Sequence, residues 1–316
     1  MSRLQPTHGT RSDAASAWSA SLLPMFRRRV YAAVILAWCA TVPVAAQDGP
    51  KHFLWKVEGS GATAYLLGSL HVLTSDYYPL SPTIDRAFAA SLTLVEEVDL
   101  DEMSDPTQMM SAMAKAMLTD GRSLDQLVSP ATYTEVGKRA TAVGLPMAAL
   151  QRMKPWLVAL VLMAPSLQAA GLSAEYGVDK HFFDRAKEAG MKRQAFETLA
   201  YQLDRFDQLS PKLQEDMLTS TMAELDTYAG KLRDLAQAWA AGDVATLEKE
   251  LLSAFDKSQE IYDRLLVERN RNWLPQVDTC LQQNAGCFIV VGAAHLVGPD
   301  GLPALLAKRG YRVTQQ

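Results

Sequence analysis

Two histidines in this sequence each stand three positions after a glycine, and each follows a run of apolar residues. His71 ends the segment 64–71, and His295 ends the segment 287–295. A continuous apolar run bounded by glycine is typical of a buried strand. Glycine lets backbone or ligand approach closely, and strand exits are where α/β sheets usually place their sites. The two Gly-x-x-His segments are therefore the strongest indication of chemistry in the chain.

Two glutamates occupy comparable places. Glu97 follows Glu96 near the end of a strand predicted over 91–99, and Glu197 ends a short strand predicted over 192–197. Carboxylates at the end of a buried strand are costly unless they are exposed, paired or bound to a metal. Neutral imidazoles and carboxylates are the ligands of hydrolytic zinc, manganese or cobalt sites, where the metal polarises a carbonyl and activates water. A nearby carboxylate such as Glu97 could serve as the general base.

The residues by themselves do not decide between a metal site and a structural explanation. A lone buried histidine is usually a hydrogen-bonded core residue, and Gly-x-x-His is a loose pattern. Arg269 and Asn270 begin a helix that leads into the His295 strand, where they could hold an oxyanion or a substrate carboxylate. A solvated helix face explains them equally well. The sequence contains neither a Gly-x-Ser-x-Gly elbow nor a His-Glu-x-x-His motif, so serine hydrolases and zincins lack motif support.

The N-terminal segment is predicted to be a secretory signal. Three arginines at 27–29 precede an apolar run over 30–40, and small residues follow up to Ala46, after which we expect cleavage. The apolar run is too short for a permanent membrane span. Met25 directly precedes the basic cluster, so residues 1–24 are interpreted as an upstream extension. The mature chain, residues 47–316, is then a single periplasmic or secreted domain.

The net charge of the mature chain bears on which partners it can bind. Removal of residues 1–46 takes away five arginines and Asp13, so the net charge changes from −4 to −8. An acidic chain without a basic run argues against nucleic acid and against anionic membrane surfaces as partners.

Cys280 and Cys287 remain in the mature chain and flank the turn into the His295 strand. In an oxidising compartment we expect a disulfide between them, with two buried thiols as the alternative. Their spacing does not resemble that of a zinc site.

The elements that position these residues follow from local patterns. Segments 53–57 and 63–67 predict a β-hairpin, and Ser81-Pro82 begins a helix. From about 101 to 285 the signals are mostly helical, with helices at 129–144, 154–170 and 178–190 and a long amphipathic stretch from Ser210 that breaks at Gly230 and Gly242. A helix over 299–310 and a strand over 311–314 complete the chain. The fold class is α/β (α+β), a central mixed sheet from two related halves with a large helical insertion.

Five methionines near the start of the helical region lie at helical spacings: Met103, Met109, Met110, Met113 and Met117. Filling a core or a groove is the simpler interpretation, because methionine is a common gap-filler, and copper or haem ligation is the alternative. Ser69, Thr74 and Tyr77 flank His71 and could orient it or a substrate.

The chain resembles the TraB/GumN family, relatives of the Tiki proteases. The resemblance rests on segments 54–57 and 65–71, the strand end at 97–99, and segment 290–298, and it continues through 177–179, 196–198, 269–270 and 301–313. It covers essentially the whole mature chain. The family's two motif histidines fall on His71 and His295, and its strand-end acid falls on Glu97. Glu197 matches its Glu-Thr segment, and Arg269 with Asn270 its Arg-Asn pair.

The resemblance implies a sheet built from two halves and, for the Tiki branch, a manganese- or cobalt-dependent metalloprotease. The leading hypothesis is therefore an exported metal-dependent hydrolase, a peptidase acting in the cell envelope. His71, Glu97, Glu197 and His295 would hold manganese, cobalt or zinc, and Arg269 and Asn270 would position substrate. Kinship with the erythromycin-esterase and ChaN-like group suggests a second hypothesis, a non-catalytic protein that binds haem or a similar ligand. An accessory role in envelope polysaccharide production is the third.

Overall fold

The structure is a computed structural model that describes residues 50–59, 61–282 and 286–316. These residues belong to one compact unit, Asp48–Gln316. The predicted signal peptide, its cleavage site and the expected start at Met25 lie outside the described residues.

A mixed sheet organises the part of the chain that the structure describes. Its six strands lie in the order β4-β3-β5-β2-β1-β6, and their bounds are β1 (Leu54–Glu58), β2 (Thr63–Ser69), β3 (Thr93–Val98), β4 (Lys192–Glu197), β5 (Cys287–Gly292) and β6 (Arg312–Gln315). Strands β4, β3, β5 and β2 run parallel, whereas β1 and β6 are antiparallel to their neighbours. The carboxyl ends of the four parallel strands therefore meet at one edge of the sheet.

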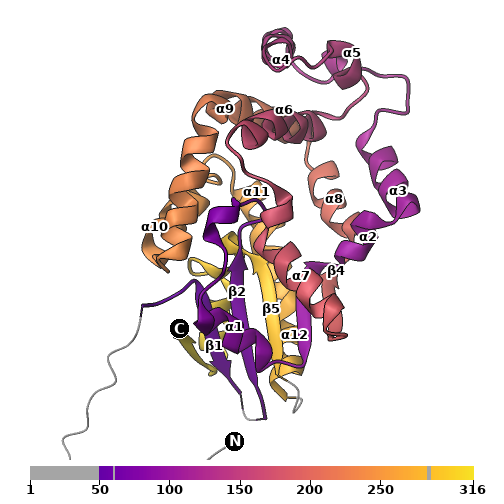
Figure 1. The fold of residues 1–316 in the computed structure, drawn as a ribbon. Coiled ribbons are helices and arrows are strands. Elements are labelled where there is room, and N and C mark those ends of the chain that lie inside the picture. Colours follow the sequence, from indigo (N-terminus) through magenta and orange to yellow (C-terminus); the bar gives the residue numbers. More distant parts are fainter. Residues whose placement is uncertain (1–49, 60, 283–285) are drawn as a thin grey trace, which may run out of the picture. The chain divides into compact units, whose positions relative to one another are not determined.

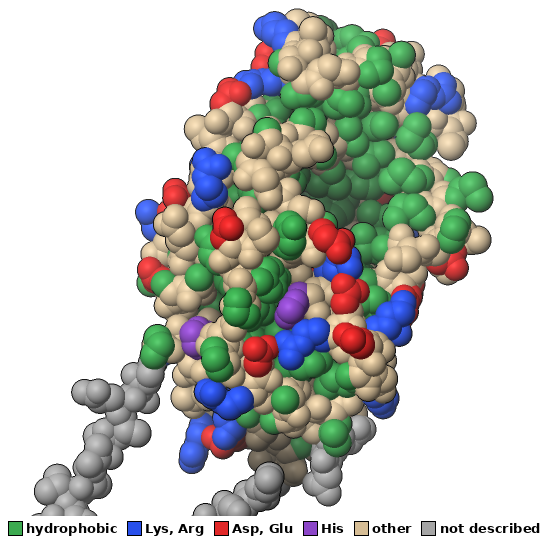
Figure 2. All heavy atoms as spheres, viewed as in Figure 1, with side chains coloured by type: hydrophobic (Ala, Val, Ile, Leu, Met, Phe, Trp, Pro, Cys, Tyr) green, Lys and Arg blue, Asp and Glu red, His purple; other side chains and the backbone are tan. Residues whose placement is uncertain are grey.

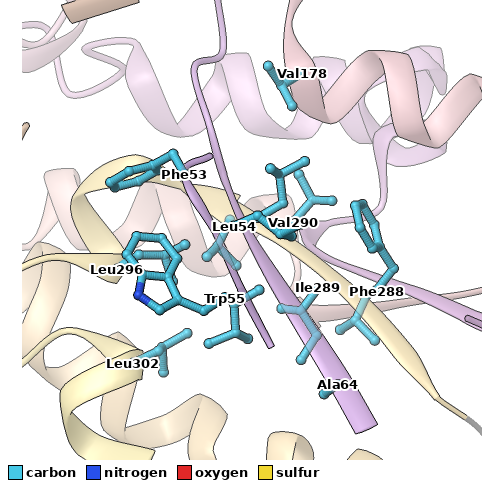
Figure 3. Packing of buried hydrophobic residues seen from close by; sticks show 14 of the residues in the cluster. Phe53, Leu54, Trp55, Ala64, Val178, Phe288, Ile289, Val290, Leu296 and Leu302 are labelled. Carbon is cyan, nitrogen blue, oxygen red and sulfur yellow. The ribbon is translucent and has the colours of Figure 1, made fainter. Parts of the chain in front are cut away.

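Helices cover both faces of this sheet. On one face, α1 (Pro82–Ala89) and α7 (Val178–Glu188) bring Phe88 and Phe182 against Phe288 of β5, at ring distances of 5.4 and 4.8 Å. On the other face, α12 (Glu268–Gln282) stacks Trp273 on Phe196 of β4. Figures 1 and 3 show this layering and the apolar side chains that fill it. The continuous apolar strands predicted from sequence are thus buried on both faces.

The remaining helices form the expected large insertion, which has a hydrophobic core of its own. They comprise α2 (Leu100–Ser104), α3 (Pro106–Ala116), α4 (Pro130–Ala142), α5 (Met147–Leu150), α6 (Pro155–Ala169), α8 (Leu199–Asp207), α9 (Pro211–Ala240), α10 (Val244–Ser253) and α11 (Gln259–Tyr262). The short α13 (Leu302–Lys308) follows β5, outside the insertion, and packs in the core of the sheet. None of the helices in the described ranges is both long and apolar enough to cross a bilayer.

Ser-Pro pairs begin three of these helices, as predicted. The hydroxyls of Ser81, Ser129 and Ser210 accept hydrogen bonds from backbone N–H groups in the first turns of α1, α4 and α9, at 3.2, 3.2 and 3.3 Å. Proline follows each serine, where it sacrifices no intrahelical bond because the N–H would be unpaired anyway.

The break predicted at Gly230 is wrong. Helix α9 continues through Gly230 to Ala240, and Gly242, with a φ of +64°, follows its end. A glycine inside a helix costs about 1 kcal/mol relative to alanine, which packing can offset. Here α9 packs along α6 and shares a hydrophobic core with it, so tertiary contact overrides the local preference.

The methionine cluster lies largely at the surface rather than in the core. Met103, Met110 and Met113 are 46%, 70% and 43% exposed. Figure 2 shows hydrophobic side chains around a hollow in the part of the molecule where α3, α6 and α8 lie in Figure 1.

Two features connect α12 to its neighbours. A π-helical turn, Asp263–Val267, joins α11 to α12 without interruption. At the other end of α12, Cys280 and Cys287 form the expected disulfide, with their Cα atoms 5.8 Å apart.

Candidate functional site

The two motif glycines have different roles. Strands β2 and β5 run parallel, with Ser69 beside Gly292, so both motifs end at the same edge of the sheet. A Cβ atom at Gly68 would lie 2.2 Å from the Phe53 ring. A Cβ atom at Gly292 would instead lie 3.1 Å from Glu97 Oε1, 3.3 Å from His71 Nε2 and 3.7 Å from His295 Cδ2. Gly68 thus permits core packing, and Gly292 leaves a space that three of the predicted site residues surround.

Arg269 links the carboxylates of two strands. From α12 its guanidinium donates to Glu97 Oε2 at 2.5 Å and to both oxygens of Glu197 at 2.8–3.1 Å. Glu197 also accepts a 2.9 Å bond from the Trp273 indole. The backbone N–H of Gly292 donates to Glu97 Oε1 at 2.6 Å. The Glu97 carboxylate is therefore fixed from two directions.

His295 is buried and is held by the neighbour of Arg269. Its Nδ1 lies 2.7 Å from Asn270 Oδ1, and Asn270 Nδ2 donates to the carbonyl of Asp300 at 2.8 Å. Because Asn270 Oδ1 can accept only, Nδ1 carries the proton and Nε2 has the lone pair. Arg269 Nη1 lies 3.1 Å from this Nε2.

His71 is held in a corresponding way from the opposite face. Its Nδ1 lies 3.4 Å from Asp179 Oδ2, and Asp179 accepts a 2.7 Å bond from the Ser69 hydroxyl. Asp179 stands in the first turn of α7, where its backbone N–H donates back to Ser69. Both motif histidines thus have Nδ1 fixed by an outer side chain. Nε2 of His71 lies on the Gly292 side, whereas Nε2 of His295 faces Arg269 and presents its ring carbon Cδ2 to that side.

The charges of these groups follow from their surroundings. Burial disfavours the charged form of Glu97, but Arg269, the two motif histidines and the Gly292 N–H together outweigh burial and hold the pKa of Glu97 well below its usual range. Burial, reinforced by Arg269 against the pull of Glu97, lowers the pKa of His295 to about 3. Burial also opposes charge on His71, yet the Asp179 carboxylate prevails and raises the pKa of His71 to about 9. The His71 side chain is nevertheless 61% exposed.

His71 owes this exposure to a cavity of about 480 Å³ at the carboxyl edge of the sheet. Ser69, Glu97, Asp179 and Gln202 also line it, and Gln202 donates a 2.9 Å bond to Glu97 Oε2. The apolar part of the wall comes from β3, β5, α2, α7 and the 3₁₀ turn Ala174–Tyr176: Val98, Leu100, Met103, Ala174, Phe183, Val290 and Val291. The polar part adds Glu96, Asp101, Ser104, Lys180, Asp184 and Lys187.

The structure brings His71, Glu97 and His295 together around Gly292. It places Glu197 and Arg269 behind Glu97, and Asn270 behind His295. None of these three residues lines the cavity, and neither does the buried His295. Tyr77 lines a separate small cavity with His52 and Trp239. Thr74 precedes the 3₁₀ turn that contains Tyr77, and neither residue has a described contact with His71.

Sequence reasoning did not select Asp179, Gln202 or Trp273 as site residues. Asp179 and Ser69 are 110 positions apart, so their contact depends on the packing of α7 against the sheet. The available signal was the position of Asp179 in the first turn after Gly177, where an acid usually stabilises the helix.

The donor set suits a divalent metal in chemistry. Neutral imidazole and ionised carboxylate are ligands for manganese, cobalt and zinc, and outer residues of the Asp179 and Asn270 type commonly orient ligating histidines. Because Asp179 raises the pKa of His71 to about 9, His71 must release a proton when it binds a metal. The space that a Cβ would fill at Gly292 lies among these donors. No group of three or more His, Cys, Asp or Glu side chains in an arrangement that could hold a metal ion is found in the described ranges. One reason is that Arg269 Nη1 occupies the side of His295 that carries the lone pair.

Comparisons with known proteins agree on one family. Residues 53–315 match the model of the TraB/PrgY/gumN family. The uncharacterized protein YbaP of Shigella flexneri is 26% identical over 244 residues, which cover 77% of this chain and 87% of that protein. YbaP of Escherichia coli K12 is 26% identical over 243 residues, with the same coverage. No solved structure matches significantly. With a match that spans the sheet, the helical insertion and both Gly-x-x-His motifs, the chain belongs to the TraB/PrgY/gumN family.

Proposed function

We propose that this protein is a metal-dependent hydrolase that cleaves peptide bonds in the cell envelope. The observation that carries the proposal is the convergence of His71, Glu97 and His295 around Gly292, beside an accessible cavity that His71 and Glu97 line. A manganese, cobalt or zinc ion held there would supply Lewis-acid polarisation of a carbonyl and activation of water.

The residues of the chain divide into two groups in this proposal. His71, Glu97 and His295 are the ligands. Glu97 accepts from Gly292 and Gln202, and its lowered pKa suits a ligand better than a general base. Glu197 and Arg269 position the ligands without binding the metal, because the N–H groups of Arg269 already contact Glu97, Glu197 and His295. If His295 held a metal ion, its Nε2 would no longer be available to Arg269.

Asn270 and Asp179 act through the histidines that they hold. Each fixes Nδ1 and so sets both the tautomer and the direction of the ring. Outer partners of this kind typically contribute about 10- to 100-fold to metal affinity.

The first test is metal content by elemental analysis of the purified protein. We expect about one manganese, cobalt or zinc ion per chain, in line with a three-ligand site. His71→Ala and the double variant His71→Ala, His295→Ala should lose the ion. His181→Ala is the matched control, because His181 stands half-buried on α7 against Tyr78 and Phe182.

A wild-type protein that stays empty after dialysis against each of the three metals contradicts the proposal. A haem titration that then gives a Soret band without hydrolysis would favour the non-catalytic binding protein. If the metal is present, chelator-sensitive cleavage of a peptide library is the next measurement.

A further inference from the structure

Two consecutive glutamates on β3 face opposite sides of the sheet. Glu97 points toward α12 and the site around Gly292, whereas Glu96 is beside Val290 of β5 and points toward α7. Both residues line the same cavity, but they differ in their partners. Glu97 accepts bonds from three residues. Glu96 is 4% exposed, and its buried Oε1 has no hydrogen-bond partner within the described part of the chain.

An unpaired buried oxygen of this kind needs an explanation. A buried acceptor without a partner has a desolvation cost that a hydrogen-bonded one avoids. The proposed chemistry around Gly292 does not use Glu96, because on β3 it is Glu97 that is directed at Gly292. Glu96 lines the cavity, so a rotation of its carboxyl group would bring Oε1 to the cavity surface, where a ligand can supply the missing donor.

The other charged groups on this side of the cavity already have partners. Lys180 binds Asp184 at 2.5 Å, and Lys187 binds Asp101 at 2.6 Å. These pairs leave little unbalanced charge for an ionic ligand. Leu100, Met103 and Phe183 add apolar surface to the cavity. A charged group of a ligand would be costly to bury against this surface. The surroundings of Glu96 therefore favour an uncharged N–H donor on an apolar body.

We propose that Glu96 is a substrate-binding residue that accepts a hydrogen bond from an amide N–H of the substrate through Oε1. The apolar wall from α2 and α7 then receives the adjoining apolar side chain. The inference rests on the proposed function in taking the substrate to be a peptide. It adds a specificity element on the opposite face of β3 from the reacting groups.

The test uses two small probes that differ in one atom pair. N-methylhexanamide has one amide N–H, and methyl hexanoate has an ester oxygen in its place. Binding of each to the purified protein is measured by NMR titration, without any turnover. We expect the wild-type protein to bind the amide about tenfold more tightly than the ester, as the loss of one hydrogen bond to a buried acceptor implies.

Three variants identify the responsible atom. Glu96→Met removes the acceptor and should abolish the preference for the amide. Glu96→Gln retains an acceptor oxygen and should keep the preference within about threefold, on the same hydrogen-bond argument. Asp184→Asn, the matched control on the same cavity, should behave as the wild type. Thermal unfolding verifies that each variant is folded.

Equal binding of the two probes to the wild-type protein overturns the inference, as does absence of binding. A preference that survives Glu96→Met also overturns it. So does a preference that Glu96→Gln removes completely, because the glutamine retains an acceptor oxygen and the preference would then not depend on one. The outcome is separable from the proposed function. If the protein binds metal but shows no preference for the amide, only this inference is wrong. If it shows the preference but binds no metal, only the proposed function is wrong.

Discussion

Arg269 is a buried cation with two carboxylate partners, and its exposed fraction is 8%. Its planar fork binds Glu197 through two nitrogens and still reaches Glu97. The Trp273 ring lies 4.9 Å from the guanidinium carbon and closes the network on one side. A lysine offers a single ammonium and cannot reproduce this arrangement.

Truncation of Arg269 should be strongly destabilising. Arg269→Met leaves Glu97 and Glu197 buried without their cation, and we expect a loss of about 3–5 kcal/mol in the free energy of unfolding. Urea unfolding at neutral pH measures it. Arg271→Met on the same helix is the control, since the Arg271 side chain is 65% exposed, and its cost should stay below about 0.5 kcal/mol. Comparable losses in the two variants would show that the network is not a stabilising unit.

Glu96 should make stability depend on pH. Burial, with Asp179 and Asp99 nearby, raises the pKa of Glu96 to about 9 from an ordinary value of 4.5. The folded protein therefore holds a proton that the unfolded chain releases, and stability falls as pH rises between these two values. Glu96→Gln removes the titration, so its stability relative to wild type should increase with pH by up to about 1.4 kcal/mol per unit. Urea unfolding at several pH values from 5 to 9 measures the difference, and a constant difference would contradict this assignment.

At the scale of elements, the site depends on the parallel pairing of β2 and β5. That pairing places Ser69 next to Gly292, so one motif supplies His71 and the other supplies both the open space and His295. Strand β3 pairs on the other side of β5 and brings Glu97 to the same edge. The three ligand candidates thus come from three adjacent strands.

The two motif glycines should respond differently to alanine. Gly68→Ala places a Cβ 2.2 Å from the Phe53 ring, and we expect overpacking to cost about 1–3 kcal/mol or more. Gly292→Ala fits the backbone, whose φ is −50°, but it fills the space between Glu97 and His71. It should stay folded and lose its metal. Circular dichroism melts and elemental analysis of both variants separate the two effects, and retention of metal by Gly292→Ala would contradict the placement of the ion.

Local signals predicted most of the elements but not all of their partners. Apolar runs, Ser-Pro caps and the two Gly-x-x-His segments are each read within a few residues, so the sheet and the positions of His71 and His295 follow from them. The bond of Arg269 to Glu197 and the position of Asp179 behind His71 depend on how α12 and α7 pack on the sheet. The continuity of α9 through Gly230 likewise depends on α6. No short sequence pattern contains that information.

At the scale of the whole molecule, the disulfide joins the last turn of α12 to the first residue of β5. It therefore ties the helix that bears Arg269 to the strand that ends at Gly292. The sequence separation of its cysteines is 7, so it closes a short loop. In the chain-entropy model, a loop of this size contributes about 2–3 kcal/mol.

Removal of the disulfide should lower stability without removing the site. The double variant Cys280→Ala, Cys287→Ala should lose about 2–3 kcal/mol in urea unfolding and retain its metal. Reduction of the wild-type protein should cause the same loss, and a reductant should not change the double variant. Loss of metal from a folded double variant would show that the crosslink positions the ligands directly.

The π-helical turn before α12 limits the insertions and deletions that this part of the chain can tolerate. One extra residue in a helical turn rotates everything that follows by about 100° relative to what precedes. The face of α12 that bears Arg269 and Asn270 is therefore oriented toward the sheet through the segment Asp263–Val267. Insertions and deletions are ordinarily tolerated in partly exposed segments. Here a single-residue deletion would rotate α12 relative to α11, so that the two helices could not both keep their present packing. Evolution should therefore have conserved the length of this segment more strictly than its composition.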